Sequence, residues 1–171
     1  MDRMACVNLR ALALQILLAR NPDWREKPAA LVSEDRPTGR VVMANRAARS
    51  LGIHAGMRYA SALSLEGGLQ AGTVLPRELE HTRDRIRSLL SHWSPAVEAS
   101  GFDPGVFWVN ASGLSYLYPS LSAWAEGMQE EIAAEGLRAA VSIGFSRFGT
   151  YAGTRTGREL LVMDGPEQEL R

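Results

Sequence analysis

The stretch "MACVNLRALALQILLAR", residues 4–20, contains a short apolar run that passes directly into a helix-forming segment. Residues 4–9 are predicted to form a strand, and residues 10–20 a helix. Asn8 and Arg10 stand at the junction between the two. Strand-to-helix junctions of this kind often carry the metal-binding carboxylate of an enzyme. An amide and a cation at this place therefore need an explanation.

Residues 22–75, which follow the first helix, contain predicted elements of their own. Two short strands are expected over residues 28–34 and 39–46, separated by a turn-forming cluster. Two short helices follow, and Asn45 can cap the first of them. The glycine-rich residues 66–72 are interpreted as a loop. This segment is therefore predicted to be a small subdomain inserted after the first helix.

The chain from residue 76 onward alternates long helices with short strands. The predicted elements are a helix over 76–93, strands over 95–101 and 105–113, a helix over 120–136, a strand over 138–146, a weak helix over 148–157 and a strand over 159–164. With the inserted segment set aside, the order is strand, helix, strand, strand, helix, strand. This order predicts an α+β protein with a ferredoxin-like βαββαβ arrangement.

The composition is that of an ordinary globular chain. Hydrophobic residues make up 46% of the chain and charged residues 22%. Its length of 171 residues is enough for one domain with a small insertion. The longest apolar stretch, residues 11–19, is too short to span a bilayer, and no secretion signal is recognised. Cys6 is the only cysteine, which excludes an internal disulfide and fits a reducing cytoplasm.

The charges balance, with 19 basic and 19 acidic residues. A protein that holds a polyanion by charge alone usually has a basic excess. Any contact of this chain with nucleic acid is therefore expected to be local or shared with other segments.

Several stretches resemble Y-family DNA polymerases. The most specific is "ANRAARSLGIHAGM" (44–57), and "KPAALV" (27–32) and "AAVSIGFSRFGTYA" (139–152) also match the family's spacing. Two further stretches, "NPDWREKP" (21–28) and "GVFWVNASGLSYLYPS" (105–120), are similar to the ImuB-type proteins of bacterial mutagenesis cassettes. The resemblance covers nearly the whole chain.

The resemblance implies a domain organisation. Residues 1–21 and 76–171 are expected to form the palm, and residues 22–75 the fingers. The thumb and little-finger domains of the family are expected to be absent from this chain.

The resemblance also implies where catalytic acids would stand. The family uses two Mg²⁺ ions, held by an aspartate at the end of the first palm strand and by an Asp-Glu pair on the central hairpin. Asn8 stands at the first of these positions, and Asp103 and Pro104 at the hairpin pair. Arg10 replaces a further acidic position, and an alternative alignment places Asn110 opposite a later one. Because these positions are degenerate, we expect no metal, no cofactor and no enzymatic activity.

Weak contacts to DNA or nucleotide are expected from the fingers. Arg49 matches an arginine that touches the incoming triphosphate in the family, and Arg46 stands where the family has a tyrosine. Arg40 can join them in a basic edge, although a solvated surface is an equal alternative. On the central hairpin, Phe107 and Trp108 alternate faces, so one of them is expected to reach the outer sheet surface and stack bases or meet a partner protein.

The function that this resemblance favours is a non-catalytic adaptor in translesion synthesis. It would contact primer-template DNA weakly, in the cytoplasm and away from membranes. It would recruit an error-prone DNA polymerase, a RecA-like accessory protein and the sliding clamp, mostly through segments outside this chain. Two alternatives remain open: an active Y-family polymerase fragment, and a ferredoxin-like protein-interaction domain that does not touch DNA.

Overall fold

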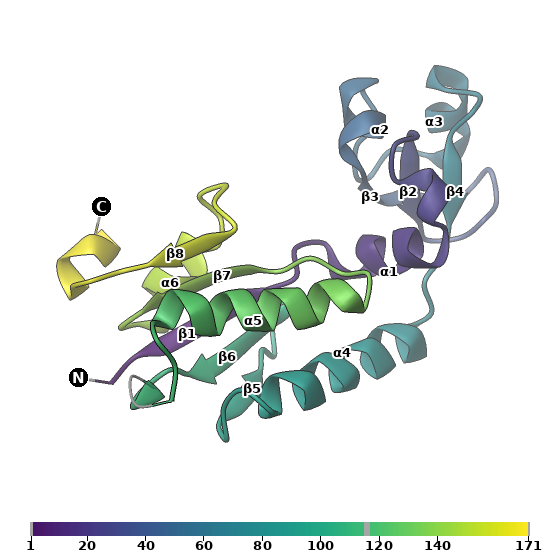
Figure 1. Ribbon diagram of the computed structural model, residues 1–171. Coiled ribbons are helices and arrows are strands. Elements are labelled where there is room, and N and C mark those ends of the chain that lie inside the picture. The colour runs from purple at the N-terminus through teal and green to yellow at the C-terminus, as the bar shows by residue number, and fades with distance from the viewer. Residues whose placement is uncertain (1, 115–116, 171) are drawn as a thin grey trace. The chain divides into compact units, whose positions relative to one another are not determined.

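The computed structural model describes residues 2–114 and 117–170, and Figure 1 shows the arrangement of the elements. The strands are β1 (Met4–Asn8), β2 (Ala29–Val32), β3 (Val41–Ala44), β4 (Gln70–Gly72), β5 (Val97–Ala99), β6 (Val106–Asn110), β7 (Ala140–Gly144) and β8 (Leu160–Val162). The helices are α1 (Leu12–Arg20), α2 (Arg46–Ser50), α3 (Tyr59–Leu65), α4 (Pro76–Ser91), α5 (Leu121–Ala134) and α6 (Arg147–Gly153). Short 3₁₀ helices cover Pro22–Trp24 (η1) and Pro166–Leu170 (η3).

The chain divides into two compact units. The larger unit comprises residues 1–10 and 81–171, and the inserted unit comprises residues 11–80. The sequence placed the first helix with the palm, whereas α1 belongs to the inserted unit, because its buried leucines pack with Leu31 of β2. The identification of the two units as palm and fingers stays a prediction.

The larger unit is built on one five-stranded sheet in the order β5-β6-β1-β7-β8. The strand β1 lies in the middle and is antiparallel to both β6 and β7, and β8 is added parallel to β7. The four strands β1, β5, β6 and β7 have the order of a ferredoxin-like sheet, which confirms the predicted α+β class.

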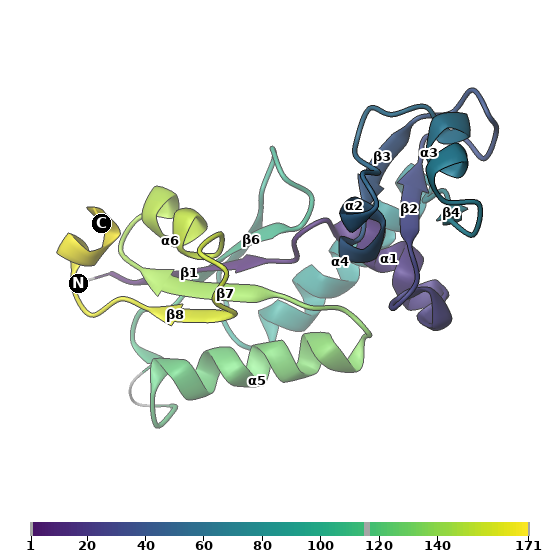
Figure 2. The same ribbon diagram turned by 90° about the horizontal axis from the view of Figure 1, so that it is seen from above.

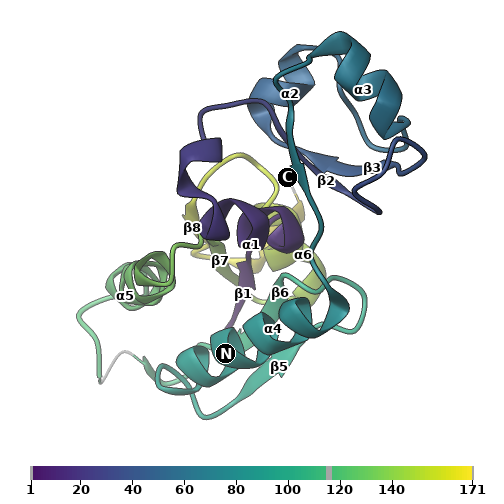
Figure 3. The same ribbon diagram turned by 90° about the vertical axis from the view of Figure 1, so that its right-hand side faces the viewer.

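Helices cover both faces of this sheet. Figure 2 shows β1, β7 and β8 between α5 on one side and α6 on the other, and Figure 3 places α4 on the side of α5. Residues two apart on a strand share a face. Tyr151 of α6 packs against a cluster of Cys6, Val106 and Trp108, so these side chains point toward α6. Asn8, two residues after Cys6, belongs to the same face.

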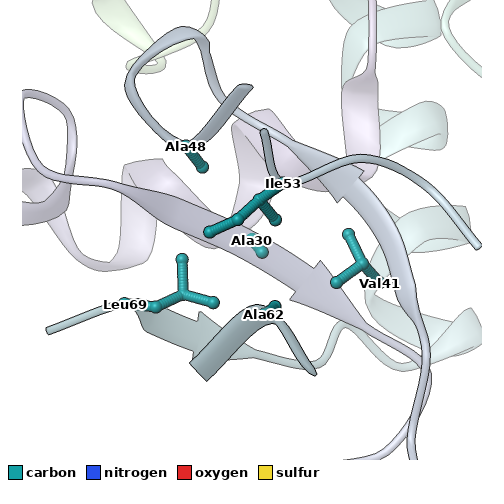
Figure 4. Close-up of a cluster of buried hydrophobic side chains, with 6 residues drawn as sticks. All are labelled: Ala30, Val41, Ala48, Ile53, Ala62 and Leu69. Carbon is teal, nitrogen blue, oxygen red and sulfur yellow. The ribbon is translucent and has the colours of Figure 1, made fainter. Parts of the chain in front are cut away.

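The inserted unit has a three-stranded sheet of its own, in the order β3-β2-β4. Figure 4 shows the apolar cluster that holds this unit together, formed by Ala30, Val41, Ala48, Ile53, Ala62 and Leu69. The predicted cap is confirmed, because Asn45 Oδ1 accepts a hydrogen bond of 2.9 Å from the Ala48 N–H at the start of α2. The prediction of a loop over residues 66–72 is wrong in part: Gln70–Gly72 form β4, which pairs in parallel with β2.

Within residues 2–114 and 117–170, no helix has the length and apolar character that a bilayer crossing requires.

Candidate functional site

Asn8 occupies the position of greatest interest, the last residue of β1. It lies opposite Val106 on one side and Ala140 on the other, and only 1% of it is exposed. Its Nδ2 donates a hydrogen bond of 2.9 Å to Thr154 Oγ1, just after α6. Among the described residues, its Oδ1 finds no hydrogen-bond partner. The carboxamide is therefore held beneath α6 with one polar atom unsatisfied.

The chain turns sharply directly after Asn8. The Leu9 N–H donates to Gly105 O over 2.8 Å, which continues the pairing with the hairpin. Arg10 is exposed. Ala11 then adopts a left-handed conformation, with φ 53° and ψ 47°, and α1 begins at Leu12. A left-handed alanine costs about 1 kcal/mol, so this turn carries local backbone strain.

The hairpin does not place Asp103 and Pro104 opposite Asn8. The residue that pairs with Asn8 is Val106, preceded by Gly105. Asp103 instead shapes the loop between β5 and β6, because its Oδ1 accepts a hydrogen bond of 3.0 Å from the Gly105 N–H. Asp103 directly precedes Pro104, and aspartate and proline are both typical turn residues.

Asn110 also stands away from the end of β1. It pairs with Met4 at the opposite end of that strand. Its Oδ1 accepts a hydrogen bond of 2.8 Å from the Ser112 N–H. The alternative alignment therefore brings no further polar group to Asn8.

The end of β1 does not fit a pair of divalent cations. Magnesium prefers several carboxylate oxygens, and a two-metal site needs ions about 4 Å apart. Asn8 is neutral, and Asp103 is engaged in its own turn. In the part of the chain that the structure describes, no three His, Cys, Asp or Glu side chains are grouped so that they could hold an ion. No chemical step is therefore assigned to a metal at these residues.

Other buried polar groups lie on the same face of the sheet as Asn8. Ser142 of β7 is fully buried, and its Oγ has no hydrogen-bond partner within the described residues. Burial raises the pKa of the Cys6 thiol to about 12, although a hydrogen bond with Thr154 lowers the pKa and the charge of Asp103 adds to the rise. Cys6 therefore stays protonated at neutral pH and is neither a nucleophile nor a metal ligand there.

The arginines predicted to contact DNA or nucleotide lie in the inserted unit, and all three are exposed. Arg46 and Arg49 stand three residues apart on α2, so they share a helix face. Arg40 lies before β3, and its Nη1 donates a hydrogen bond of 2.8 Å to Gly56 O. Arg46 and Arg49 can therefore act as a pair, whereas Arg40 is tied to the loop that follows α2.

The prediction that Phe107 or Trp108 reaches the outer sheet surface is wrong. Phe107 is 0% exposed and Trp108 6% exposed, because helices cover both faces of the sheet. Among the described residues, the exposed aromatic side chains are Phe102, 69% exposed in the β5–β6 loop, and Phe148, 80% exposed on α6. Neither belongs to a periodic apolar pattern, so no signal in the sequence predicted a role for them.

A groove of about 480 Å³ opens on the α6 side of the sheet, near the start of β1. Arg147 donates two hydrogen bonds, of 2.9 and 2.6 Å, to the Glu98 carboxylate, which lowers the pKa of Glu98. Its guanidinium also lies 5.5 Å from the centre of the Trp108 ring. Asn8, Asp103 and Pro104 do not line this groove.

Comparison with known proteins provides the family context for this geometry. The model of the impB/mucB/samB family matches residues 7–152. Two curated proteins from Dehalococcoides mccartyi, each named DNA polymerase IV, are 27% identical over 164 residues and 28% identical over 149 residues. These matches cover 91% and 85% of the chain but only 40% and 37% of the relatives.

Solved structures share the fold. A post-insertion binary complex of Dbh DNA polymerase matches with a TM-score of 0.82 at 19% identity, over 97% of this chain and 49% of that one. A crystal structure of DinB from Sulfolobus solfataricus matches with a TM-score of 0.77 at 18% identity, over 94% and 48%. The chain therefore spans about half the length of these polymerases.

These comparisons correct one prediction. The degenerate positions led to the expectation that the chain is not an enzyme. The curated relatives are named DNA polymerase IV, and the matched structures are of DNA polymerases, which contradicts that expectation. The similarity to the ImuB-type branch stays a prediction, since none of the matches described above carries that name.

Proposed function

Because the chain belongs to the impB/mucB/samB family and has a Y-family polymerase-like fold, we propose that it forms the palm and fingers of a translesion DNA polymerase and holds primer-template DNA. The observation that carries this proposal is the family match over residues 7–152, which includes all of the inserted unit and most of the larger one. The relatives' name points to nucleotidyl transfer as the reaction class.

The contacts to DNA are proposed to be local, because the net charge of the chain is zero. Arg46 and Arg49 present two guanidinium groups on one face of α2, and guanidinium groups bind phosphates in a bidentate manner. In the larger unit, Arg155 and Arg158 follow α6 and are exposed. These four arginines supply positive charge without a basic excess over the whole chain.

No step of the transfer reaction is assigned to Asn8 or Asp103. The amide of Asn8 is buried and hydrogen-bonded to Thr154, and Asp103 stabilises its own loop. The roles proposed for the four arginines are binding and orientation of DNA. A primer-extension assay with Mg²⁺ and dNTPs would show whether the chain also carries out the transfer.

A gel-shift titration of the 171-residue chain with primer-template DNA at low salt tests the proposal. We expect retention of the DNA at micromolar protein, with affinity that falls steeply as salt rises. No retention at any salt concentration would contradict the proposal and favour a protein-interaction domain. The primer-extension assay on the same sample shows whether the chain only binds DNA or also extends the primer.

A recruiting role is proposed in addition. The balanced charge, which limits how strongly the chain alone can hold DNA, favours a chain that works beside other proteins of translesion synthesis. The partners proposed are an error-prone DNA polymerase, a RecA-like accessory protein and the sliding clamp. Size-exclusion chromatography of the chain with each partner in turn tests this role. Elution of the chain at its own position in all three mixtures, with no peak for a complex, would contradict it.

A further inference from the structure

Four side chains on the α6 side of the larger unit form a patch, and the proposed function uses only the arginine among them. This α6 patch consists of Phe102, Phe148, Tyr151 and Arg155. Phe102 and Phe148 are the most exposed phenylalanines among the described residues, at 69% and 80%. Large exposed aromatic rings that gather in one place usually mark a binding surface.

Contacts within the α6 patch hold its rings in place. The Phe102 ring meets the Tyr151 ring edge to face, with 5.7 Å between the ring centres. Arg155 lies 5.5 Å from the centre of the Tyr151 ring, and its Nη1 donates a hydrogen bond of 2.9 Å to Tyr151 Oη. Phe148 stands one helical turn before Tyr151, on the same side of α6. The loop after β5 and the helix α6 thus present one surface.

The α6 patch borders the end of β1. Tyr151 packs against Cys6, Val106 and Trp108 beneath it. Three residues later, Thr154 accepts the hydrogen bond from Asn8. Phe102 directly precedes Asp103 in the hairpin loop. The patch therefore adjoins Asn8 and the loop that carries Asp103.

The chemistry of the α6 patch fits single-stranded nucleic acid. Unpaired bases stack on aromatic side chains, and arginine adds cation–π and phosphate contacts. Arg155 carries a positive charge, and among the described residues it forms no ion pair with a carboxylate. Arg158, three residues further on, is also exposed. The positive charge favours an anionic strand over an apolar protein surface.

We propose that the α6 patch binds single-stranded DNA, with unpaired bases stacked on Phe102 and Phe148 and a backbone phosphate on Arg155. The inference rests on the proposed function and names a contact that the family match does not assign. It predicts that the chain binds an unpaired strand through a surface separate from Arg46 and Arg49.

Fluorescence anisotropy with labelled oligothymidylate of about 12 nucleotides tests this inference. The double variant F102A/F148A is expected to bind at least about fivefold more weakly, because stacking on each ring is lost. Its salt dependence should be unchanged, because no charge is removed. Arg155→Gln should weaken binding and also reduce the salt dependence. Leu65→Ala, which truncates a 54% exposed side chain of the inserted unit, is the control and should have no effect.

The outcomes separate the two claims. If F102A/F148A and the unaltered chain bind oligothymidylate equally well, the claim that the α6 patch binds single-stranded DNA is overturned. Binding of primer-template DNA would still support the proposed function in that case. An unaltered chain that binds neither DNA would overturn both. Circular dichroism of F102A/F148A shows that the variant is folded, and an unchanged spectrum is expected because both rings are exposed.

Discussion

Asn8 Nδ2 and Thr154 Oγ1 are joined by a hydrogen bond of 2.9 Å, which connects the end of β1 with the C-terminal end of α6. Both residues are 1% exposed. Thr154 Oγ1 also donates to Tyr151 O over 2.7 Å. The threonine hydroxyl thus provides the acceptor for the buried Asn8 Nδ2, whereas Asn8 Oδ1 has no partner among the described residues.

Thr154→Val is expected to lower the free energy of unfolding by about 1–3 kcal/mol, because it leaves Asn8 Nδ2 buried without an acceptor. Urea unfolding followed by circular dichroism measures this loss. Thr38→Val, at an exposed position of the inserted unit, is the matched control and should change stability by less than about 0.5 kcal/mol. Equal effects of the two substitutions would show that the Asn8–Thr154 bond does not stabilise the fold.

Ala11→Gly is expected to stabilise the chain slightly or to leave its stability unchanged. Glycine removes the strain of the left-handed conformation, which is worth about 1 kcal/mol, but it also makes the unfolded chain more flexible. Ala19→Gly, inside the right-handed helix α1, is the control and should destabilise by about 1 kcal/mol. A clear loss of stability in Ala11→Gly would contradict the assigned turn.

Gly127→Ala is expected to destabilise the chain although alanine favours helices. A Cβ at this position of α5 would clash with the edge of the Trp93 ring. We expect this overpacking to lower the free energy of unfolding by about 1–3 kcal/mol. The Trp93 ring is held by a hydrogen bond of 2.5 Å to Glu131, so it cannot yield easily. Gly67→Ala meets no atom within 4 Å and should be nearly neutral in thermal unfolding.

Glu169 should make stability depend on pH. Burial acts to raise the pKa of Glu169, but hydrogen bonds from Ser146 Oγ and from the N–H groups of Phe145 and Ser146 outweigh it and lower the pKa. A lowered folded-state pKa means that the stabilisation is present above the unfolded value of 4.5 and is lost as the pH falls through the folded value.

Glu169→Gln should therefore lose about 1 kcal/mol at pH 7 and much less near pH 3. Urea unfolding over that range measures the difference from the unaltered chain. The exposed Glu167 supplies the control, and Glu167→Gln should track the unaltered chain at every pH. A loss in Glu169→Gln that is the same at every pH would rule out the charge of Glu169 as its source.

Arg46→Gln combined with Arg49→Gln is expected to weaken binding of primer-template DNA and to reduce the slope of log affinity against log salt by about 2. Each arginine that contacts a phosphate releases counterions, so the loss should not depend on the DNA sequence. Arg85→Gln removes a charge that pairs with Glu135 between α4 and α5 and serves as the control. An unchanged slope in the double variant would exclude these arginines from the interface.

The arrangement of strands and helices was largely predictable from the sequence, because apolar periodicity and capping residues such as Asn45 are local signals. The strand β4 was missed because its glycine-rich residues become extended only through pairing with β2. Tertiary pairing of this kind overrides local preference.

The site was harder to predict than the fold. Asp103 and Pro104 were aligned with the family's pair of hairpin acids, whereas the register between β1 and β6 places Val106 opposite Asn8. Register depends on the length of the hairpin loop and on packing of the sheet faces, which one sequence does not reveal. The exposure of Phe102 and Phe148 is likewise a result of how the loop and α6 pack on the sheet.

Hydrogen–deuterium exchange of the chain with and without primer-template DNA tests the central claim most directly. The account predicts slower exchange in α2 and in the residues after α6, where the four arginines lie, and no change in α5 on the opposite face of the sheet. A Y-family polymerase whose amide exchange slows when the same DNA is added serves as the control. If DNA changes the exchange rate nowhere in the chain under those conditions, the claim that this fold holds DNA is contradicted.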